Sequence, residues 1–280
     1  MKADCHIHMV LDGRDWRKAI GRHTAAPDEC FIRRVLKRYQ DLGYTYLRDG
    51  GDRWGVGAGA RRLAPEYGIT YRTPGAPLVK KGHYGGFIGL YYEDLREYAG
   101  FVERARSTGM DFIKIMISGL MDFDRFGVLT EPGLPEREIT ELVHIAHEEG
   151  MAVMAHANGT DTVMAAAKAG VDSVEHGAYL DREALAAMVQ NHVVWVPTVS
   201  TVCNLIGAGR FSDDAVKAIR DSFFQNIADF ISMGGLLAPG SDAGAWNVPH
   251  GAMTEEQHLF FAGVPDEVLR SGISAIIHKF

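Results

Sequence analysis

The stretch Asp4-Cys5-His6-Ile7-His8 lies at the start of this 280-residue chain and decides how the rest of it is interpreted. Residues 2–10 alternate and are apolar enough to form a β-strand, in which side chains at i and i+2 point to the same face. His6 and His8 are therefore expected to face one side and Ile7 the other. Two imidazoles side by side on a rigid strand make half of a metal site. The His-x-His motif also arises by chance, so it indicates a metal site only if further ligand residues follow at the ends of other strands.

Length and composition favour one large soluble domain. A chain of 280 residues fits a single α/β barrel better than two domains. Hydrophobic residues make up 46% and charged residues 23%, which is ordinary for a soluble globular protein. The formal net charge of -7 argues against a nucleic-acid partner and against binding to an anionic membrane surface.

Cysteine usage and hydropathy indicate a cytoplasmic protein. Cys5, Cys30 and Cys203 are few and unclustered, which suggests a reducing compartment without a disulfide framework. The N-terminus has a charged strand where a signal peptide would need a long apolar core. The longest apolar run, at 193–202, is broken by Pro197 and is too short to span a bilayer.

Short apolar runs alternate with amphipathic stretches along the whole chain. This alternation is typical of βα units on a parallel sheet. Segments 12–27 and 73–89 are expected to be loops. Strands are expected at 2–10, 44–48, 69–72, 111–117, 151–155, 171–174, 193–196 and 236–238. Eight strands with intervening helices predict an α/β (β/α)8 TIM barrel, and we expect residues 1–280 to form one catalytic domain of this kind.

Residues of the types that bind metals lie at or near the ends of these strands. They are His6, His8, Lys114, His156, His176 and Asp242. Each has a plain structural explanation when taken alone; Lys114 could extend to water from an edge strand, and Asp242 could make a turn before Gly244. In a closed barrel, however, these positions converge on one mouth. Their shared register with eight strands makes coincidence a poor explanation.

This pattern resembles the amidohydrolase superfamily of metal-dependent hydrolases over nearly the whole chain. The shared motifs are His-x-His on strand one, Lys on strand four, His on strands five and six, and Asp on strand eight. Within the superfamily the chain looks most like the imidazolonepropionase and prolidase-like branch. That closer likeness rests on Lys80-Lys81-Gly82-His83-Tyr84-Gly85, Val174-Glu175-His176-Gly177-Ala178-Tyr179-Leu180-Asp181, Val196-Pro197-Thr198, Gly240-Ser241-Asp242-Ala243-Gly244 and Pro249-His250-Gly251.

The resemblance implies a binuclear metal centre. Lys114 would be carboxylated and bridge two divalent ions, commonly zinc. One ion would be held by His6, His8 and Asp242, and the other by His156 and His176. A water between the ions would be largely hydroxide near neutral pH and would attack a substrate carbonyl, while Asp242 moves the proton to the leaving group. The expected bond is an amide in a dipeptide, an N-acyl amino acid or a cyclic amide; a lactone or other ester is the alternative.

The chain departs from the branch in one respect. Members usually carry a small β-sandwich built from segments before the first strand and after the last helix. Here the sequence starts at the first strand and stops at Phe280. We therefore expect the barrel without its usual β-sandwich domain.

Two other functions fit part of the pattern. A mononuclear aminohydrolase (deaminase) uses the same barrel, but those enzymes do not use a strand-four lysine. They also place a glutamate soon after the fifth-strand histidine, where this chain has Ala157-Asn158-Gly159. The second alternative is a catalytically silent barrel that serves as a binding protein. Such relatives typically lack ligands, whereas all six positions are filled here.

Loop residues near the expected mouth are candidates for contact with a small-molecule substrate. We predict such contacts for His83, Tyr84, Tyr179 and His250. A substrate carboxylate could meet one of several cationic side chains, among which the sequence does not choose: Lys80, Lys81, Arg125 and Arg210. Assembly into a homo-oligomer is left open.

Overall fold

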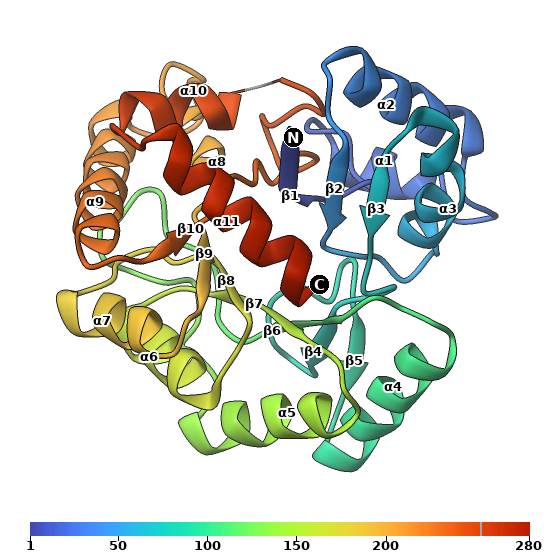
Figure 1. Cartoon of the computed structure of the whole chain (residues 1–280), viewed down its shortest axis with the longest axis horizontal. Coiled ribbons are helices and arrows are strands. Elements are labelled where there is room, and N and C mark those ends of the chain that lie inside the picture. Colours follow the sequence, from blue (N-terminus) through green and yellow to red (C-terminus); the bar gives the residue numbers. More distant parts are fainter. Residues whose placement is uncertain (253) are drawn as a thin grey trace.

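Parallel strands form the centre of the fold, with helices around them (Figure 1). The computed structural model describes residues 1–252 and 254–280. One sheet has the order β1 (Ala3–Ile7), β2 (Tyr46–Asp49), β3 (Thr70–Arg72). The other runs through β10 (Leu236–Leu237), β9 (Val194–Val196), β8 (Ser173–His176), β7 (Val153–Ala157), β6 (Ile113–Met116), β4 (Leu78–Lys80) and β5 (Leu90–Tyr92).

Backbone hydrogen bonds join the two sheets at both edges. On one side, the Cys5 N–H donates to the Pro239 carbonyl at 2.9 Å, and the Asp242 N–H donates to the His6 carbonyl at 2.7 Å. On the other side, the Asp111 N–H donates to the Thr73 carbonyl at 3.0 Å. The strands therefore close into a barrel, and the predicted (β/α)8 fold is confirmed.

Both segments that were expected to be loops contain regular structure, so that prediction is wrong. Segment 12–27 contains α1 (Trp16–Gly21), whose first turn is capped by the Asp15 carboxylate. Segment 73–89 contains β4, which pairs with β6 through Leu78 and Ile115. The third barrel strand is therefore split: β3 pairs with β2, and β4 pairs with β6. Three-residue strands among glycines and prolines leave no periodic signal in the sequence.

Amphipathic helices cover the outside of the barrel. In α2 (Glu29–Asp41), the buried face carries Ile32 and Leu36, and Asp28 caps the first turn. None of the described helices has the length and apolar content of a membrane-spanning segment. The remaining helices are α3 (Val56–Leu63), the 3-10 turn η1 (Ala64–Tyr67), α4 (Leu95–Ser107), α5 (Glu136–Glu148), α6 (Thr160–Ala169), α7 (Arg182–Gln190), α8 (Ser200–Cys203), α9 (Asp213–Ser232), α10 (Thr254–Phe261) and α11 (Asp266–Lys279).

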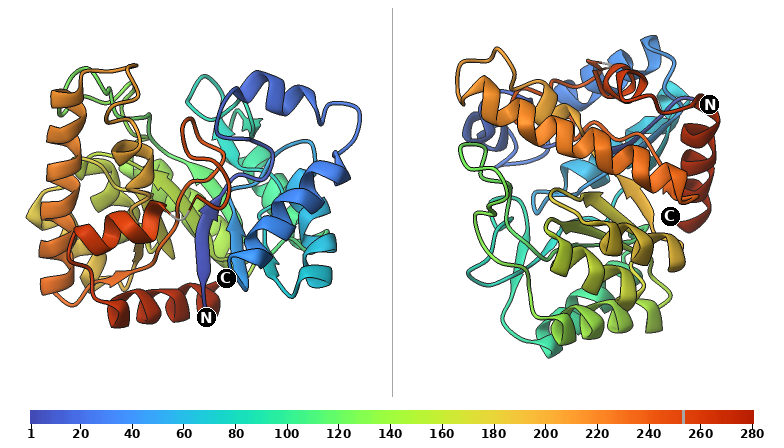
Figure 2. Two further views of the ribbon diagram at one scale, coloured as in Figure 1. Left: turned by 90° about the horizontal axis from the view of Figure 1, so that it is seen from above. Right: turned by 90° about the vertical axis from the view of Figure 1, so that its left-hand side faces the viewer.

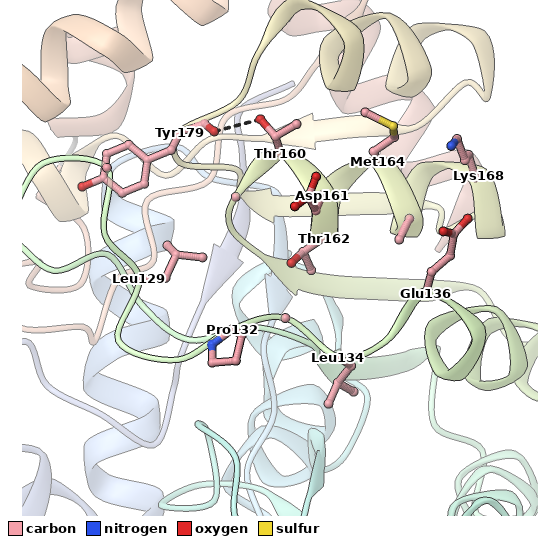
Figure 3. Close-up of a pocket in the computed structure, with 14 residues that line it drawn as sticks. Leu129, Pro132, Leu134, Glu136, Thr160, Asp161, Thr162, Met164, Lys168 and Tyr179 are labelled. Atoms are coloured by element: carbon pink, nitrogen blue, oxygen red, sulfur yellow. Dashed lines mark hydrogen bonds between the residues drawn. The ribbon is translucent and has the colours of Figure 1, made fainter.

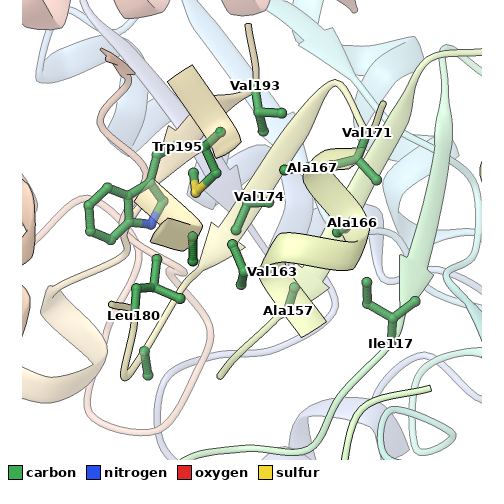
Figure 4. Close-up of a cluster of buried hydrophobic side chains, with 14 of the residues drawn as sticks. Ile117, Ala157, Val163, Ala166, Ala167, Val171, Val174, Leu180, Val193 and Trp195 are labelled. Atoms are coloured by element: carbon green, nitrogen blue, oxygen red, sulfur yellow. The ribbon is translucent and has the colours of Figure 1, made fainter. Parts of the chain in front are cut away.

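Small side chains allow α6 to pack closely on the strands (Figure 4). Val163 and Ala166 of this helix are buried in one cluster with Val174 of β8 and Ala157 of β7. Along β8, Val174 faces this outer cluster, so its neighbours Ser173 and Glu175 point toward the barrel interior. The same alternation brings charged residues into the barrel.

The last helix covers one end of the barrel (Figure 1). Ile276 of α11 and the terminal Phe280 are buried against Cys5, Phe112 and Met154, all of which lie in or beside the first half of a barrel strand. Figure 2 shows both chain ends on this covered face. The carboxyl ends of the strands therefore open on the opposite face, where barrel enzymes place their chemistry.

Candidate metal centre

The six predicted ligand residues lie together where the strands end at this open face. His6, Lys114, His156 and His176 belong to β1, β6, β7 and β8. His8 follows β1, and Asp242 follows β10. All six side chains are buried. Residues that are far apart in the sequence are thus brought together by strand order alone.

Three of these residues form a group with the dimensions of a cation site. The Nε2 atoms of His6 and His8 are 3.4 Å apart. Oδ1 of Asp242 lies 3.6 Å from Nε2 of His6 and 3.3 Å from Nε2 of His8. All three ligand atoms lie within 4.8 Å of one another. Two imidazoles and a carboxylate with this spacing suit a divalent transition metal.

The other two histidines lie beside this group. The ring centroids of His156 and His176 are 4.6 Å apart, and those of His176 and His6 are 5.2 Å apart. Nε2 of His156 lies 3.2 Å from the carbonyl oxygen of Gly119. A carbonyl only accepts, so Nε2 carries the proton and Nδ1 is left as the ligand atom. Nδ1 of His176 lies 2.7 Å from Oγ1 of Thr198, which leaves Nε2 of His176 for a cation.

Burial keeps these imidazoles neutral. It lowers the pKa of His8 and of His156 to about 3, and the nearby Lys114 adds to both shifts. Burial also lowers the pKa of His6 and of His176 well below the usual value. A neutral imidazole is the form that binds metals, so these candidate ligands are in the binding form at ordinary pH.

Lys114 is buried close enough to these residues for its charge to act on each of them. Its side chain is 1% exposed, and its Nζ has no hydrogen-bond partner among the described residues. Burial lowers the pKa of Lys114 to about 8, although the charge of Glu175 opposes the shift. An unpaired buried amine is costly unless something else satisfies it. Neutral imidazoles and one carboxylate, beside a buried amine, form a donor set that suits divalent cations.

Three residues of this region have strained backbone conformations. His176, Thr198 and Asp242 have φ values of 68°, 50° and 57°. Non-glycine residues rarely adopt this left-handed region, and each such residue costs roughly 1–3 kcal/mol. Two of the three are predicted ligands, and the third bonds to a ligand. Such strain is typical of sites where side-chain direction matters more than stability.

Sequence reasoning missed the residues that support the ligands. Glu175 accepts from Nδ1 of His6 at 2.7 Å, and Arg48 donates to Glu175 at 2.8 Å. Gly50 leaves the space that the His8 ring fills. A charged residue inside an apolar strand is the signal that could have identified Arg48 and Glu175, as it did Lys114. Gly50 gives no such signal.

The predicted substrate contacts lie in different surroundings. The Tyr84 ring is 5.2 Å from the His156 ring, and burial together with the Asp242 charge raises the pKa of Tyr84. His83 is half-buried, 3.6 Å from Glu131. Both ring nitrogens of His250 face protein atoms, with Nε2 3.0 Å from the Leu11 carbonyl. The structure thus brings Tyr84 to the ligands, and all these substrate roles stay predictions.

Tyr179 lies beside a separate cavity of about 580 Å³ (Figure 3). The cavity lies between α6 and the segment that precedes α5, and Tyr179 and Leu129 are among its lining residues. Thr160 of α6 donates to the Tyr179 carbonyl at 3.1 Å. None of the six ligand residues lines this cavity. It therefore belongs to the rim of the barrel and not to the metal centre.

Sequence comparison finds curated relatives over most of the chain. An ochratoxinase from Aspergillus niger is 24% identical over 279 residues, which cover 85% of this chain and 56% of that protein. An uncharacterized protein from Mycobacterium tuberculosis is 30% identical over 262 residues, which cover 90% of this chain and 65% of that protein. The chain therefore spans about half to two thirds of the length of these curated relatives.

Structural comparison gives the same fold. The crystal structure of a Xaa-Pro dipeptidase with bound methionine in the active site superposes with a TM-score of 0.79 at 21% identity, covering 99% of this chain and 75% of that one. The family described as "Amidohydrolase family" matches residues 58–257, which is more than half of the sequence. This chain belongs to the amidohydrolase family.

Proposed function

We propose that this chain is a metal-dependent hydrolase that cleaves the amide bond of a small substrate such as a dipeptide, an N-acyl amino acid or a cyclic amide. One observation carries the proposal. His6, His156 and His176 each use one ring nitrogen to contact a protein partner, which leaves the other ring nitrogen for a cation. Near them, the Nζ of Lys114 has no hydrogen-bond partner among the described residues.

Two divalent cations, commonly zinc in this superfamily, would fit the donor set. His6, His8 and Asp242 would hold one cation, and His156 and His176 would hold the other. Lys114, carboxylated on Nζ, would be the shared ligand. When bound, such cations lower the pKa of water and polarise a substrate carbonyl.

Asp242 is the residue that we propose to move the proton. Its Oδ1 has no hydrogen-bond partner among the described residues, and burial raises the pKa of Asp242 to about 8. A carboxylate that lies beside the attacking water can accept its proton and then donate it to the leaving group. Asp242 would take a proton from the attacking water and return it to the leaving amine. Tyr84, at the same mouth, would contact the substrate.

Arg210 is the cation that we propose for a substrate carboxylate. Its guanidinium lies 4.6 Å from the ring centroid of Trp246 and 5.2 Å from that of Phe211. In the described part of the chain it forms no ion pair. The other three candidates already have acidic partners, since Lys80 pairs with Glu138, Lys81 with Glu93 and Arg125 with Asp122. Arg210 follows β9 and Trp246 follows β10, at the open end of the barrel.

The similarity to a Xaa-Pro dipeptidase favours an amide bond over a lactone or other ester. The buried, unpartnered Lys114 favours two cations over the single cation of a deaminase. We also propose a cytoplasmic location, because Cys5, Cys30 and Cys203 are all free.

The test uses protein stripped with a chelator and reloaded with Zn²⁺, Co²⁺ or Mn²⁺. Dipeptides, N-acyl amino acids, cyclic amides and lactones are offered as substrates. We expect amide cleavage that requires two cations per chain and falls about 10²–10⁴-fold in Asp242→Asn. Release of ammonia from a ring amine by protein holding one cation would show a deaminase instead. Absence of turnover in fully loaded protein would support a silent binding barrel.

A further inference from the structure

A buried ion pair lies directly behind the metal centre. Arg48 of β2 and Glu175 of β8 are both 0% exposed. The Arg48 guanidinium donates to Oε1 of Glu175 at 2.8 Å, to Oγ of Ser173 at 3.0 Å and to the Cys5 carbonyl at 2.7 Å. Every branch of the guanidinium therefore has an acceptor. Two charges this deep in a barrel are held only because they are paired and fully hydrogen-bonded.

The second oxygen of Glu175 reaches a metal ligand. Oε2 lies 2.7 Å from Nδ1 of His6. An ionised carboxylate accepts only, so the proton of a neutral His6 is placed on Nδ1. The lone pair is then on Nε2, the atom that faces Nε2 of His8 and Oδ1 of Asp242. The carboxylate thus fixes both the tautomer and the direction of the ring.

The covered end of the barrel completes this arrangement. The ring of Phe280 lies 4.5 Å from the Arg48 guanidinium and packs edge-on against Phe112, with the ring centroids 5.1 Å apart. Phe280 is 8% exposed, so the terminal aromatic ring separates the ion pair from solvent. Water at this position would compete for the guanidinium and weaken its hold on Glu175.

We infer that Glu175, held by Arg48 beneath the Phe280 ring, is a positioning residue that presets His6 as a metal ligand. The inference deepens the proposed function, because it concerns the same metal centre. Metal affinity would then depend on Arg48 of β2, Glu175 of β8 and Phe280, which lie on the side of the metal centre away from the open face.

The first measurement is made on the unaltered, metal-free protein. ¹⁵N NMR of the histidine rings reports which nitrogen of His6 carries the proton. We expect the Nδ1–H tautomer. Finding the proton on Nε2 overturns the inference, and this result depends on neither catalytic activity nor the folding of any variant.

The second measurement is Zn²⁺ affinity in Glu175→Gln, determined by competition with a chelating dye. The amide can present an NH₂ group to His6 and so favour the wrong tautomer. Affinity should fall about 10–100-fold, the range for outer partners of metal ligands. Turnover, if the chain has any, should recover when Zn²⁺ saturates the variant. An affinity within twofold of that of the unaltered protein overturns the inference.

Matched variants separate positioning from stability. Asp172 is a carboxylate near the start of β8 that pairs with His147 and Lys279 and contacts no ligand. Asp172→Asn should lower thermal stability and leave Zn²⁺ affinity unchanged. Arg48→Lys keeps the charge and should retain more affinity than Arg48→Met. Phe280→Ala should weaken Zn²⁺ binding more than Ile276→Ala, because the Phe280 ring lies 4.5 Å from the Arg48 guanidinium; equal losses would assign that effect to helix docking.

Discussion

Nδ1 of His176 lies 2.7 Å from Oγ1 of Thr198, and both residues hold left-handed backbone conformations. His176 is the last residue of β8, and Thr198 follows the neighbouring strand β9. The strained backbone at each position therefore directs one of the two side chains into this contact. Thr198 is 0% exposed, and water therefore does not replace its hydroxyl group. The contact fixes the ring of one predicted ligand from outside the metal centre.

Thr198→Val is expected to weaken Zn²⁺ binding about 10–100-fold, because valine keeps the shape of threonine and removes the oxygen that orients His176. Chelator competition measures the change. Thr162→Val, a buried threonine of α6 away from the ligands, serves as the control and should bind Zn²⁺ normally. Equal affinities for the two variants would show that the Thr198 contact has no role in metal binding.

Gly50→Ala is expected to abolish tight binding at the site formed by His6, His8 and Asp242. A Cβ atom at Gly50 would lie 2.3 Å from Cε1 of His8, so the ring would have to move. Overpacking of this kind costs about 1–3 kcal/mol of stability. Gly100→Ala in the exposed part of α4 meets no atom within 4 Å and should stabilise the protein by about 1 kcal/mol. Metal titration and thermal melts distinguish the two substitutions.

Carboxylation of Lys114 predicts a carbamate signal in ¹³C NMR after the protein is incubated with ¹³C-bicarbonate and Zn²⁺. The signal should be absent in Lys114→Ala, which should also lose metal and activity. Small carboxylic acids should restore part of both, since they supply the missing oxygens. Lys114→Arg should not substitute, because its charge is permanent. An active, metal-loaded protein that shows an unmodified lysine would contradict the assignment.

The metal-free protein is expected to lose stability as the pH rises from 6.5 to 8, in part through Glu255. This buried carboxyl caps the start of α8, accepting from the N–H groups of Val199 and Ser200, and burial raises its pKa to about 8. Between these pH values the folded state binds a proton that the unfolded state has released. Raising the pH therefore lowers the free energy of unfolding. The buried histidines act in the opposite direction mainly below pH 6.5, where their unfolded forms take up protons.

Thermal melts of Glu255→Gln over the same pH range provide the check. The glutamine variant should be less stable at pH 6.5, because its amide satisfies only one of the two N–H groups as an acceptor. Its melting temperature should nevertheless fall less steeply between pH 6.5 and 8. Parallel slopes for both proteins would assign the pH dependence to the other buried carboxyl groups, Asp4, Asp49 and Asp242.

Arg210→Met is expected to raise KM by about 10-fold or more for substrates that carry a free carboxylate, through loss of a charged hydrogen bond. Substrates of the same shape with a carboxamide in that place should be unaffected. Arg125→Met is the matched control, because Arg125 is already paired with Asp122. A similar KM increase for acid and amide substrates would mean that Arg210 supports the loop and does not bind the carboxylate.

The grouping of the candidate ligands could be predicted from the sequence because these residues leave a local mark. His6 and His8 share one strand face, and Lys114 interrupts the apolar run Ile113-Lys114-Ile115. The strand order of a barrel then brings these residues together without any further information. The same logic fails for β4 and α1, which have three and six residues. Elements this short are stabilised by neighbours that the sequence does not reveal.

The supporting contacts could not be predicted for a different reason. Arg48 and Glu175 are separated by 127 positions, and their pairing depends on strand direction and side-chain rotamers inside the barrel. The missing side chain of Gly50 matters only because the fold turns the His8 ring toward it. Each residue is individually visible in the sequence, whereas the relationship between them is a property of the closed fold.

Closure of the barrel between β1 and the segment after β10 also fixes the order of events during synthesis. Ser241 donates to Asp4, 237 positions earlier, and this contact cannot form until residue 241 has left the ribosome. Contacts this distant in sequence are among the slowest to form. His6 and His8 therefore stay without their partner Asp242 until that part of the chain has been made. Capture of a cation by His6, His8 and Asp242 together would therefore follow closure of the barrel.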